Sequence, residues 1–507
     1  MSLIVDDPEL QAKVAEVLNR FPAAGLAVGV VGDGSLAWFH GQGLADVSSQ
    51  TPVTGSTVFP IASITKTFTA IAVMQLWELG LIDLDTPAGN YLRSYRLVPA
   101  RVGFPPATVR HLLTHTAGVR AVRTAADLLR PEMGWAAPAG RPAPSLAEYY
   151  RGGLRYDTEP GTRWAYSNHG YATLGQIVAD VSGLPYDRYL RQHIFAPLGM
   201  DDSDAVLSDR LRPRLATGYN LKARGPAPVP HHEVITAGGG AVYSTANDMA
   251  RYAAALLNGG AGPEGAVLRP ETLERMFAPH YQSDPRLPGM GLGFFREELG
   301  GHRTVEHDGI LNGFRTDLRL ALDDGIGVVV LANSGGFDPR GVSVPVSLAL
   351  LRLLLDLPAD VVAAGVPERP WAWGELCGWY SFGPGVLTDP QPRMAFGGGV
   401  EVVARGGHLW ARGQMPIPAL RRGLRLYPEA DDPDAFRVDL SVLGLGTCPV
   451  VFSRGPDGKV TALHLGLIPM SFRKRPDRLN PRRLIGGMLA GGAAALVLRR
   501  RRASDGG

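Results

Sequence analysis

Ser63 and Lys66 stand three residues apart at the start of an apolar segment, FPIASITKTFTAIAVMQLWELG (59–80). Apolar residues at helical spacing, with Gly80 as a stop, predict a helix with Ser63 in its first turn, and residues three apart on a helix share a face. Only five of the 51 basic residues of the chain are lysines. A neutral amine can take the proton of a serine hydroxyl, whereas arginine stays protonated in proteins. We therefore predict that Ser63 is a nucleophile and Lys66 its base.

A second stretch, GTRWAYSNHGY (161–171), places Tyr166 two residues before Asn168. The Pro160-Gly161 turn ahead of it predicts that both lie on a loop. A phenol can shuttle a proton and an amide can hold a carbonyl group, so this pair suits work on a carbonyl substrate.

A third stretch, RTVEHDG (303–309), contains His307 and Gly309. The pattern predicts that these residues end a strand. Glycine at such a place lets the backbone of a ligand approach closely.

The S-x-x-K pattern also occurs at Ser471 and Lys474, in SFRK. Three flanking basic residues and a nearby proline favour a solvated tail there. The two occurrences are therefore expected to differ in context, and only the first is expected to do chemistry.

Other candidate sites are weaker. His111 and His115 lie four apart but lack the acidic residue of an H-E-x-x-H zinc motif, and His231-His232 fits a loop pair. No G-x-S-x-G elbow of an α/β-hydrolase occurs. We expect neither a metal nor a cofactor.

S-I-T-K, Y-S-N and H-D-G stand in the order and approximate spacing of the S-x-x-K, Y-x-N and K/H-x-G triplet. This triplet is that of the serine β-lactamase and penicillin-binding protein superfamily. The chain most resembles the class C-like branch of esterases and D-amino-acid peptidases, over roughly residues 10–355. HLLTHTAG (111–118) and GGGAVYSTANDMARY (238–252) also resemble that family.

The resemblance implies a role for each motif residue. The implied roles are Ser63 as the acylated nucleophile, Lys66 and Tyr166 as its proton-transfer groups, Asn168 as the group that orients the substrate, His307 and Gly309 as the strand wall, and the backbone N–H groups of Ser63 and Ile310 as the oxyanion hole. Many penicillin-recognising relatives have lysine where this chain has His307. With an ordinary pKa near 6.5, only about a tenth of that histidine carries a charge at pH 7.4, which favours neutral substrates over carboxylates.

The elements that must position these residues follow from the hydrophobic pattern. Asp33-Gly34 and Asp324-Gly325 predict hairpins at the two ends of the first domain. We expect an α+β fold of β-lactamase/transpeptidase-like type, with an antiparallel sheet flanked by helices and closed by the two ends of the domain. Residues 121–160, rich in Ala, Pro and Gly, suit a lid or insertion that builds the pocket together with loops near 281–295. The expected strands are 25–32, 35–43, 303–309, 314–322 and 326–333, and the expected helices, besides one at the N-terminus, are 170–181, 246–258 and 345–356.

The second half of the chain changes character. Residues 1–357 are expected to form the hydrolase domain, 358–370 a linker, and 371–476 an all-β module resembling a small barrel. Residues 477–507 form a tail in which the apolar run 484–498 is followed by four arginines. At ~1.5 Å per residue this run is too short for a ~30 Å hydrocarbon core, so weak peripheral or tail-anchored membrane association stays only as an alternative.

Composition narrows the class of protein. The sequence is 45% apolar and 20% charged, typical of a globular protein. The net charge of +3 hides ten Lys and Arg against two Asp in residues 473–507, so the body is mildly acidic and a nucleic-acid partner is not expected. Two cysteines, Cys377 and Cys448, are too few for a disulfide framework, and two reduced thiols are expected. No signal peptide is visible, which favours a cytoplasmic protein.

The sequence thus predicts a serine hydrolase that acts through an acyl-enzyme on a small ester, amide or D-amino-acid peptide. Two alternatives stay open: a true β-lactamase or DD-carboxypeptidase, and a catalytically silent scaffold or sensor with the same fold. Oligomeric state does not follow from the pattern.

Overall fold

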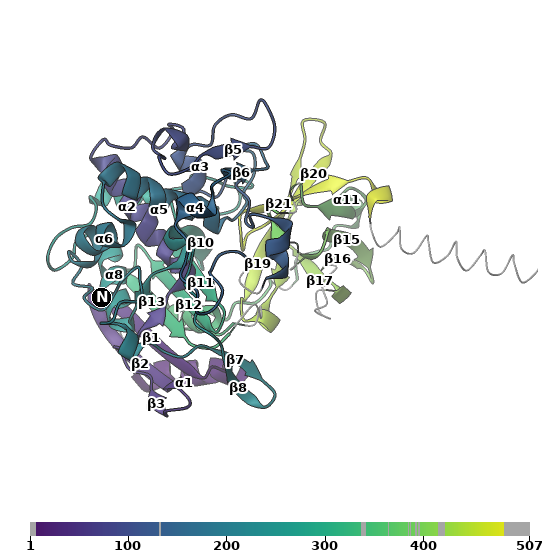
Figure 1. Cartoon of the computed structure of the whole chain (residues 1–507). Coiled ribbons are helices and arrows are strands. Elements are labelled where there is room, and N and C mark those ends of the chain that lie inside the picture. The colour runs from purple at the N-terminus through teal and green to yellow at the C-terminus, as the bar shows by residue number, and fades with distance from the viewer. Residues whose placement is uncertain are drawn as a thin grey trace, which may run out of the picture. The chain divides into compact units, whose positions relative to one another are not determined.

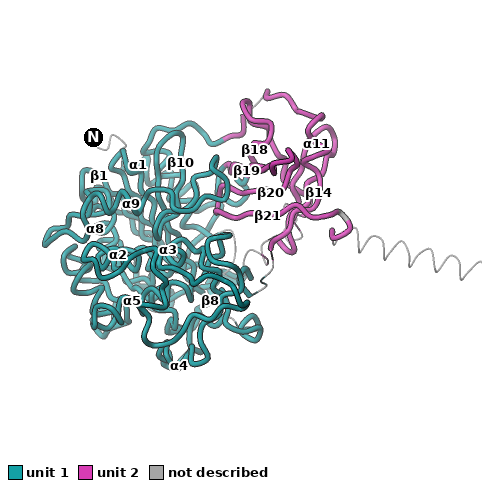
Figure 2. Tube along the Cα trace, turned by 90° about the horizontal axis from the view of Figure 1, so that it is seen from above, with its two compact units in different colours: residues 1–360, 385–390, 440–446 teal, residues 361–384, 391–439, 447–507 magenta. Residues whose placement is uncertain are grey.

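The chain divides into two compact units, coloured separately in Figure 2. The first unit is made of residues 1–360, 385–390 and 440–446, and the second of residues 361–384, 391–439 and 447–507. Two short segments that lie between strands of the second unit in the sequence thus belong to the first. The computed structural model describes residues 7–130, 133–335, 341–363, 365–383, 385, 387–390, 393, 396–413 and 421–480. The apolar run 484–498 of the tail lies outside the described residues.

A seven-stranded sheet, in the order β10-β11-β12-β13-β1-β2-β3, forms the centre of the first unit (Figure 1). The first and last strands of this unit in the sequence, β1 and β13, are neighbours in the sheet and pair antiparallel, for example Val28 with Val330. The predicted β1–β2 hairpin turns at Asp33 and Gly34, both with positive φ. The expectation of an antiparallel sheet closed by the two ends of the domain is confirmed. Its strands are β1 (Gly25–Gly32), β2 (Ser35–Asp46), β3 (Thr51–Pro52), β10 (Phe295–Leu299), β11 (His302–Leu311), β12 (Phe314–Ala321) and β13 (Ile326–Ala332).

Helices cover both faces of this sheet. The helices α1 (Asp7–Arg20) and α10 (Ser343–Leu354) pack together on one face, where their apolar side chains join those of β1 and β13 in a separate core cluster. On the other face α8 (Ala246–Leu257) packs on β1 and β13, and α2 (Thr65–Glu78) packs on α5 (Asn168–Ser182). The predicted α+β fold class is therefore confirmed.

The first unit also contains shorter elements that shape the site. The predicted insertion 121–160 carries three of them, so it is not a plain loop. The short elements used below are the 3₁₀ turns η1 (Ala62–Ile64) and η3 (Ala125–Leu129), the helices α3 (Val109–Leu113), α4 (Leu146–Tyr149), α7 (Ala237–Gly240) and α9 (Pro270–Phe277), and the strands β4 (Phe59–Pro60), β6 (Leu154–Tyr156) and β9 (Tyr243–Ser244).

The second unit contains a closed eight-stranded barrel in which β14 pairs with both β15 and β21. Its interior is aromatic: the rings of Tyr380 and Phe436 both pack on Phe452. The predicted C-terminal barrel is confirmed, although a short helix, α11 (Pro370–Leu376), precedes its strands. The strands are β14 (Gly378–Ser381), β15 (Gly399–Arg405), β16 (His408–Gly413), β17 (Leu424–Pro428), β18 (Ala435–Asp439), β19 (Thr447–Arg454), β20 (Val460–Leu465) and β21 (Met470–Arg475).

The second S-x-x-K motif lies in β21 and not in a solvated tail, so that expectation was wrong. Side chains alternate across a strand, so Ser471 and Lys474 point to opposite faces and cannot meet. Ser471 Oγ instead lies 2.9 Å from His464 Nδ1, and Lys474 Nζ donates to the carbonyl of Glu375.

Neither Cys377 nor Cys448 forms a disulfide. Within the described part of the chain, no helix is long and apolar enough to cross a membrane.

Candidate active site

Ser63 lies in the 3₁₀ turn η1, directly ahead of α2, so the predicted first turn of the helix is a tighter turn than expected. Lys66, in the first turn of α2, places Nζ 2.9 Å from Ser63 Oγ. Ala62, just before the serine, has φ of 49°, a left-handed conformation that costs an L-residue about 1–2 kcal/mol. The turn therefore places Ser63 through a backbone conformation at Ala62 that alanine does not favour.

Lys66 is fully buried, and its amine has three oxygen neighbours. Besides Ser63 Oγ, it donates to Asn168 Oδ1 at 2.7 Å and to the carbonyl of Gly239 at 2.6 Å. A neutral amine has two N–H donors and one lone pair, so it can donate to these two oxygens and accept the proton of Ser63. Burial lowers the pKa of Lys66 well below its ordinary value, and the nearby Asp308 opposes this shift. The surroundings thus favour the neutral amine that a base requires.

Tyr166 completes the cluster from the loop before α5. Its hydroxyl donates to Ser63 Oγ at 2.9 Å, and Lys66 Nζ lies 4.8 Å from the centre of its ring. Burial raises the pKa of Tyr166, and the hydrogen bond to Ser63 lowers it by less. The phenol is therefore protonated at neutral pH and has a proton to donate next to Ser63 Oγ.

Asn168 and Gly239 link the motifs to one another. Asn168 starts α5, and its Oδ1 holds Lys66, which leaves Nδ2 as the donor side of the amide. A Cβ added at Gly239 would lie 3.0 Å from the carbonyl oxygen of Asn168, and one at Gly238 would lie 2.3 Å from that of Tyr171. The glycines of α7 therefore let a backbone carbonyl reach Lys66. The sequence showed the GGG run, but its role in holding the lysine was not predicted.

His307 lies inside β11, which continues to Leu311, so the prediction that H-D-G ends a strand was wrong. Its Nδ1 lies 2.7 Å from the carbonyl of Asp308, which fixes the proton on Nδ1 and leaves a lone pair on Nε2. Burial, and then the charge of Lys66, lower the pKa of His307 to about 3. The imidazole is thus neutral throughout the ordinary pH range, more completely than the sequence suggested.

Gly309 serves a different contact from the predicted one. A Cβ there would lie 2.1 Å from Thr316 Oγ1 and 2.4 Å from the carbonyl of Ile61. The Thr316 hydroxyl donates to that same carbonyl at 2.9 Å. The glycine therefore permits close packing of β11 and β12 on the turn that carries Ser63, and its predicted contact with a ligand stays a prediction. Ile310, whose N–H was predicted to bind the oxyanion, follows directly and lines the pocket beside Ser63.

The two histidines considered as metal ligands have separate roles. His111 caps α3, with Nδ1 accepting from the N–H of Thr108, while His115 Nδ1 accepts from the N–H of Ser167 at 3.2 Å. The His115 ring lies 4.4 Å from that of Tyr166 and so supports the proton donor. Among the described residues, no group of three or more His, Cys, Asp or Glu side chains could hold a metal ion.

The pocket beside Ser63 is only partly where the sequence placed it. Trp135, from the insertion 121–160, lines it as expected. The loops near 281–295 do not line it; there Phe295 packs behind the site against Trp164 and His307. The other walls come from residues 230–240 and 310–314, which include the histidine pair that was interpreted as a plain loop.

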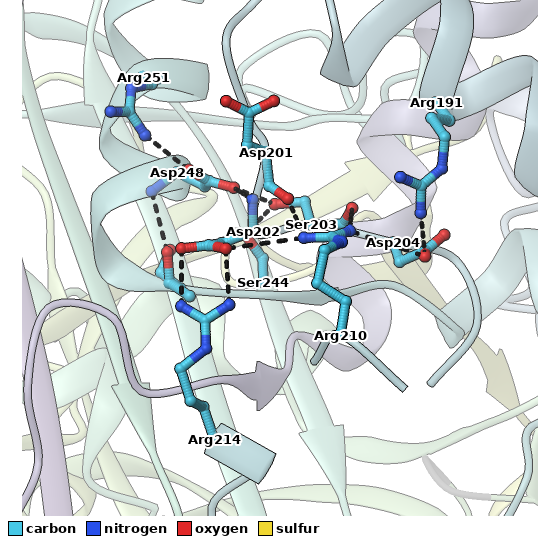
Figure 3. Close-up of polar contacts among 11 residues, drawn as sticks. Arg191, Asp201, Asp202, Ser203, Asp204, Arg210, Arg214, Ser244, Asp248 and Arg251 are labelled. Atoms are coloured by element: carbon cyan, nitrogen blue, oxygen red, sulfur yellow. Dashed lines mark hydrogen bonds and ion pairs between the residues drawn. The ribbon is translucent and has the colours of Figure 1, made fainter. Parts of the chain in front are cut away.

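A network of polar contacts supports the strand that leads to Ser63 (Figure 3). The β9 strand pairs with β4, which ends three residues before the nucleophile. Ser203 Oγ lies 2.7 Å from Ser244 Oγ of β9 and donates to Asp248 of α8 at 2.8 Å. Asp202 forms a bidentate pair with Arg214, at 2.6 and 2.8 Å. These contacts fix the backbone around β9, and no sequence pattern indicated them.

Residues 385–390 support the other side of the site. The carbonyl of Leu387 accepts from the N–H groups of Ala121 (2.9 Å) and Val122 (3.2 Å), in the insertion. Asp389 pairs with Arg163 at 2.7 Å, three residues before Tyr166. The segment therefore helps to hold the loop that carries the proton donor, a contact that sequence patterns do not reveal.

Known proteins are similar to this chain over the same region. Residues 11–351 match the family model described as "Beta-lactamase". "Penicillin-binding protein 4" of Amycolatopsis lactamdurans is 29% identical over 336 residues, covering 62% of this chain and 82% of that protein. "D-aminopeptidase" of Gluconobacter oxydans is 26% identical, covering 64% of this chain and 58% of that protein. The fold matches the structure of an octameric penicillin-binding protein homologue from Pyrococcus abyssi, with a TM-score of 0.60 and 24% identity over 93% of this chain and 100% of that one. The three motifs that the sequence placed far apart meet around one serine, and this chain belongs to the beta-lactamase family of serine hydrolases and penicillin-binding proteins.

Proposed function

We propose that this chain hydrolyses esters or amides through an acyl-enzyme formed on Ser63. The observation that carries the proposal is the double contact at Ser63 Oγ, 2.9 Å from a buried lysine amine and 2.9 Å from a buried phenol. A serine with both a base and a proton donor in reach is equipped for nucleophilic catalysis.

In the proposed acylation step, Lys66 takes the proton of Ser63 as Oγ attacks the substrate carbonyl. The backbone N–H groups of Ser63 and Ile310 stabilise the oxyanion. Tyr166 then gives its proton to the leaving oxygen or nitrogen, and the resulting phenolate is neutralised by the proton on Lys66. Asn168 orients the substrate with its Nδ2 donor.

In the proposed deacylation step, water attacks the ester carbonyl of the acyl-enzyme. Its proton passes to the Lys66–Tyr166 pair and from there to the departing Ser63 Oγ, which restores the starting state. The same two groups therefore serve both half-reactions, as microscopic reversibility requires.

The name of the D-aminopeptidase relative supports D-amino-acid amides among the substrates. A β-lactamase or DD-carboxypeptidase uses the same groups and is the alternative within the family. The neutral imidazole at position 307 favours uncharged esters and amides as substrates, because it supplies no cation for the carboxylate of a penicillin.

The test is the mass of the intact protein after exposure to an aryl ester, a D-alanyl amide, a D-Ala-D-Ala peptide and a penicillin. We expect an acyl adduct that is absent in Ser63→Ala and present in the matched control Ser471→Ala, whose serine belongs to the barrel S-x-x-K. Turnover should be abolished in the first variant only. An intact-mass spectrum without an adduct on any of the four compounds, from folded protein, would favour the silent scaffold. Activity that survives in Ser63→Ala free of contaminating esterase would disprove the assignment.

A further inference from the structure

The pocket that opens beside Ser63 is lined mainly by apolar side chains and backbone. Its walls include Trp135, Val234, Leu311 and Phe314. Among its described lining residues, none is Lys, Arg, Asp or Glu. A group that enters this pocket therefore meets hydrophobic surface next to the reacting carbonyl.

The two aromatic walls are fixed by their surroundings. The Trp135 indole Nε1 donates to the carbonyl of Ala121 at 3.1 Å, and the Trp135 carbonyl accepts from the N–H of Ile235 at 2.8 Å. Phe314 is 6% exposed and packs against Gly218, where a Cβ would lie 2.5 Å from its ring. The pocket is thus a preformed site, as ligand pockets commonly are.

Polar groups at the rim are already engaged. His231 Nε2 lies 2.8 Å from the hydroxyl of Tyr243, and His232 Nδ1 lies 3.0 Å from the carbonyl of Ala137. Partial burial, and then the charge of Arg212, lower the pKa of His231, so this ring is neutral at neutral pH. The His231 ring therefore adds polarity to the rim but no fixed charge.

The carboxylate in this loop points elsewhere. Glu233 lies between His232 and Val234, but its Oε2 accepts from the N–H of Ala143 at 2.9 Å, in the insertion. The pocket therefore offers an incoming ammonium no carboxylate from this loop. Lys66 is buried behind Ser63 and bound to three oxygens, so its amine does not serve as a carboxylate receptor.

We infer that the acyl group of the substrate is apolar and uncharged, and that it packs on Trp135 and Phe314. Burying an ion without a partner costs several kcal/mol, so acyl groups that end in an ammonium or a carboxylate are discriminated against. This inference rests on the proposed acyl-enzyme function and narrows it: the site takes lipophilic or N-blocked acyl groups, so among the D-amino-acid amides proposed above those with a free amine are poor substrates and N-acylated ones are good substrates.

The experiment compares three p-nitrophenyl esters with the same leaving group and similar chain length: hexanoate, 6-aminohexanoate and the monoester of adipic acid. We expect kcat/KM for the hexanoate to exceed that for each charged ester by at least ~10-fold, the factor that corresponds to 1.4 kcal/mol. Trp135→Ala should lower kcat/KM for the hexanoate by ~10-fold, as expected from losing a large apolar contact, and should lower that for p-nitrophenyl acetate by a smaller factor. Trp135→Phe should restore most of the hexanoate rate.

A second variant tests the charge argument by gain of function. Val234→Asp places a carboxylate in the pocket wall and should raise the ratio of 6-aminohexanoate to hexanoate rates by at least ~10-fold, whereas the isosteric control Val234→Asn should not. Equal rates for the three esters, or an unchanged ratio in Val234→Asp with the fold intact by circular dichroism, would overturn the inference. Acyl adducts on Ser63 from all three esters separate this outcome from failure of the proposed function, in which no adduct forms.

Discussion

The buried imidazole of His307 leads to a prediction about pH. The pKa of His307 is lowered to about 3, so the charged fraction is about 0.1% at pH 6 and about 0.001% at pH 8. A histidine with the ordinary pKa of 6.5 would be about 76% charged at pH 6 and about 3% at pH 8. If the imidazolium bound a substrate carboxylate, recognition of that carboxylate would fall about 25-fold over this range, or about 2 kcal/mol. The structure predicts no such fall.

The assay uses an N-acyl depsipeptide with a free terminal carboxylate and its methyl ester, which share one scissile bond. The ratio of their kcat/KM values cancels the titration of Lys66 and Tyr166, because both substrates need the same acid and base. We expect this ratio to change less than about 2-fold between pH 6 and pH 8, and His307→Gln to leave the pH response of the ratio unchanged. A ratio that falls more than about 10-fold as the pH rises, and no longer does so in His307→Gln, would show that the ring titrates in this range and refute the reasoning.

Because many penicillin-recognising relatives have lysine at this position, the sequence alone predicts that His307→Lys favours carboxylate substrates by up to ~1–2 kcal/mol, the scale of one charge-assisted hydrogen bond. The structure reduces that expectation. Position 307 is fully buried and the charge of Lys66 is felt there, so a second lysine would be neutral for much of the pH range. We expect His307→Lys to favour the free carboxylate less than 5-fold over wild type at pH 7, and to lower the pKa of Lys66 as well. A larger gain in the same depsipeptide assay would mean that position 307 is more hydrated than its burial indicates.

Three further changes probe the site and its support. Tyr166→Phe removes the phenol that donates to Ser63 Oγ, so kcat for an ester should fall by ~100-fold or more with little change in stability; a fall below ~5-fold would contradict its role. Asp308→Asn removes a charge that raises the pKa of Lys66, so the acid limb of the kcat/KM profile should move to lower pH; a shift to higher pH would contradict the assignment of the limb to Lys66. Asp389→Asn weakens the buried pair with Arg163 and should lower the free energy of unfolding by about 3 kcal/mol in urea titration, whereas a loss below about 0.5 kcal/mol would show that the pair contributes little.

Local sequence patterns were enough to predict most of the helices and strands. The β1–β2 hairpin, the helix after the nucleophile and the late strands β12 and β13 lie within a few residues of the predicted ranges, because each is set by alternation, helical spacing and Asp-Gly turns. The barrel was predicted in the same way, from short runs punctuated by turns. Local pattern failed for S-x-x-K at Ser471, since the same spacing puts two side chains on one face of a helix and on opposite faces of a strand.

The types of the reacting residues could be predicted from the sequence, because few side chains can act as a nucleophile, a base or a proton donor. A lysine in a chain rich in arginine, three residues from a serine, needs only helical geometry to be a base, and the structure places its amine 2.9 Å from that hydroxyl. The sequence could not predict how this amine becomes neutral. Its desolvation and its contact with the carbonyl of Gly239 depend on segments about 170 residues apart in the chain.

The tertiary structure alone decided what surrounds the reacting groups. Only the fold shows that a side chain at Gly309 would meet the carbonyl of Ile61 and the hydroxyl of Thr316. The sequence predicted the pocket near 281–295, but residues 230–240 form the wall. Reactivity depends on residue type and short spacing, which the sequence records directly. Burial, pKa and pocket shape depend on which distant segments come within a few ångströms, and only the packed fold determines those distances.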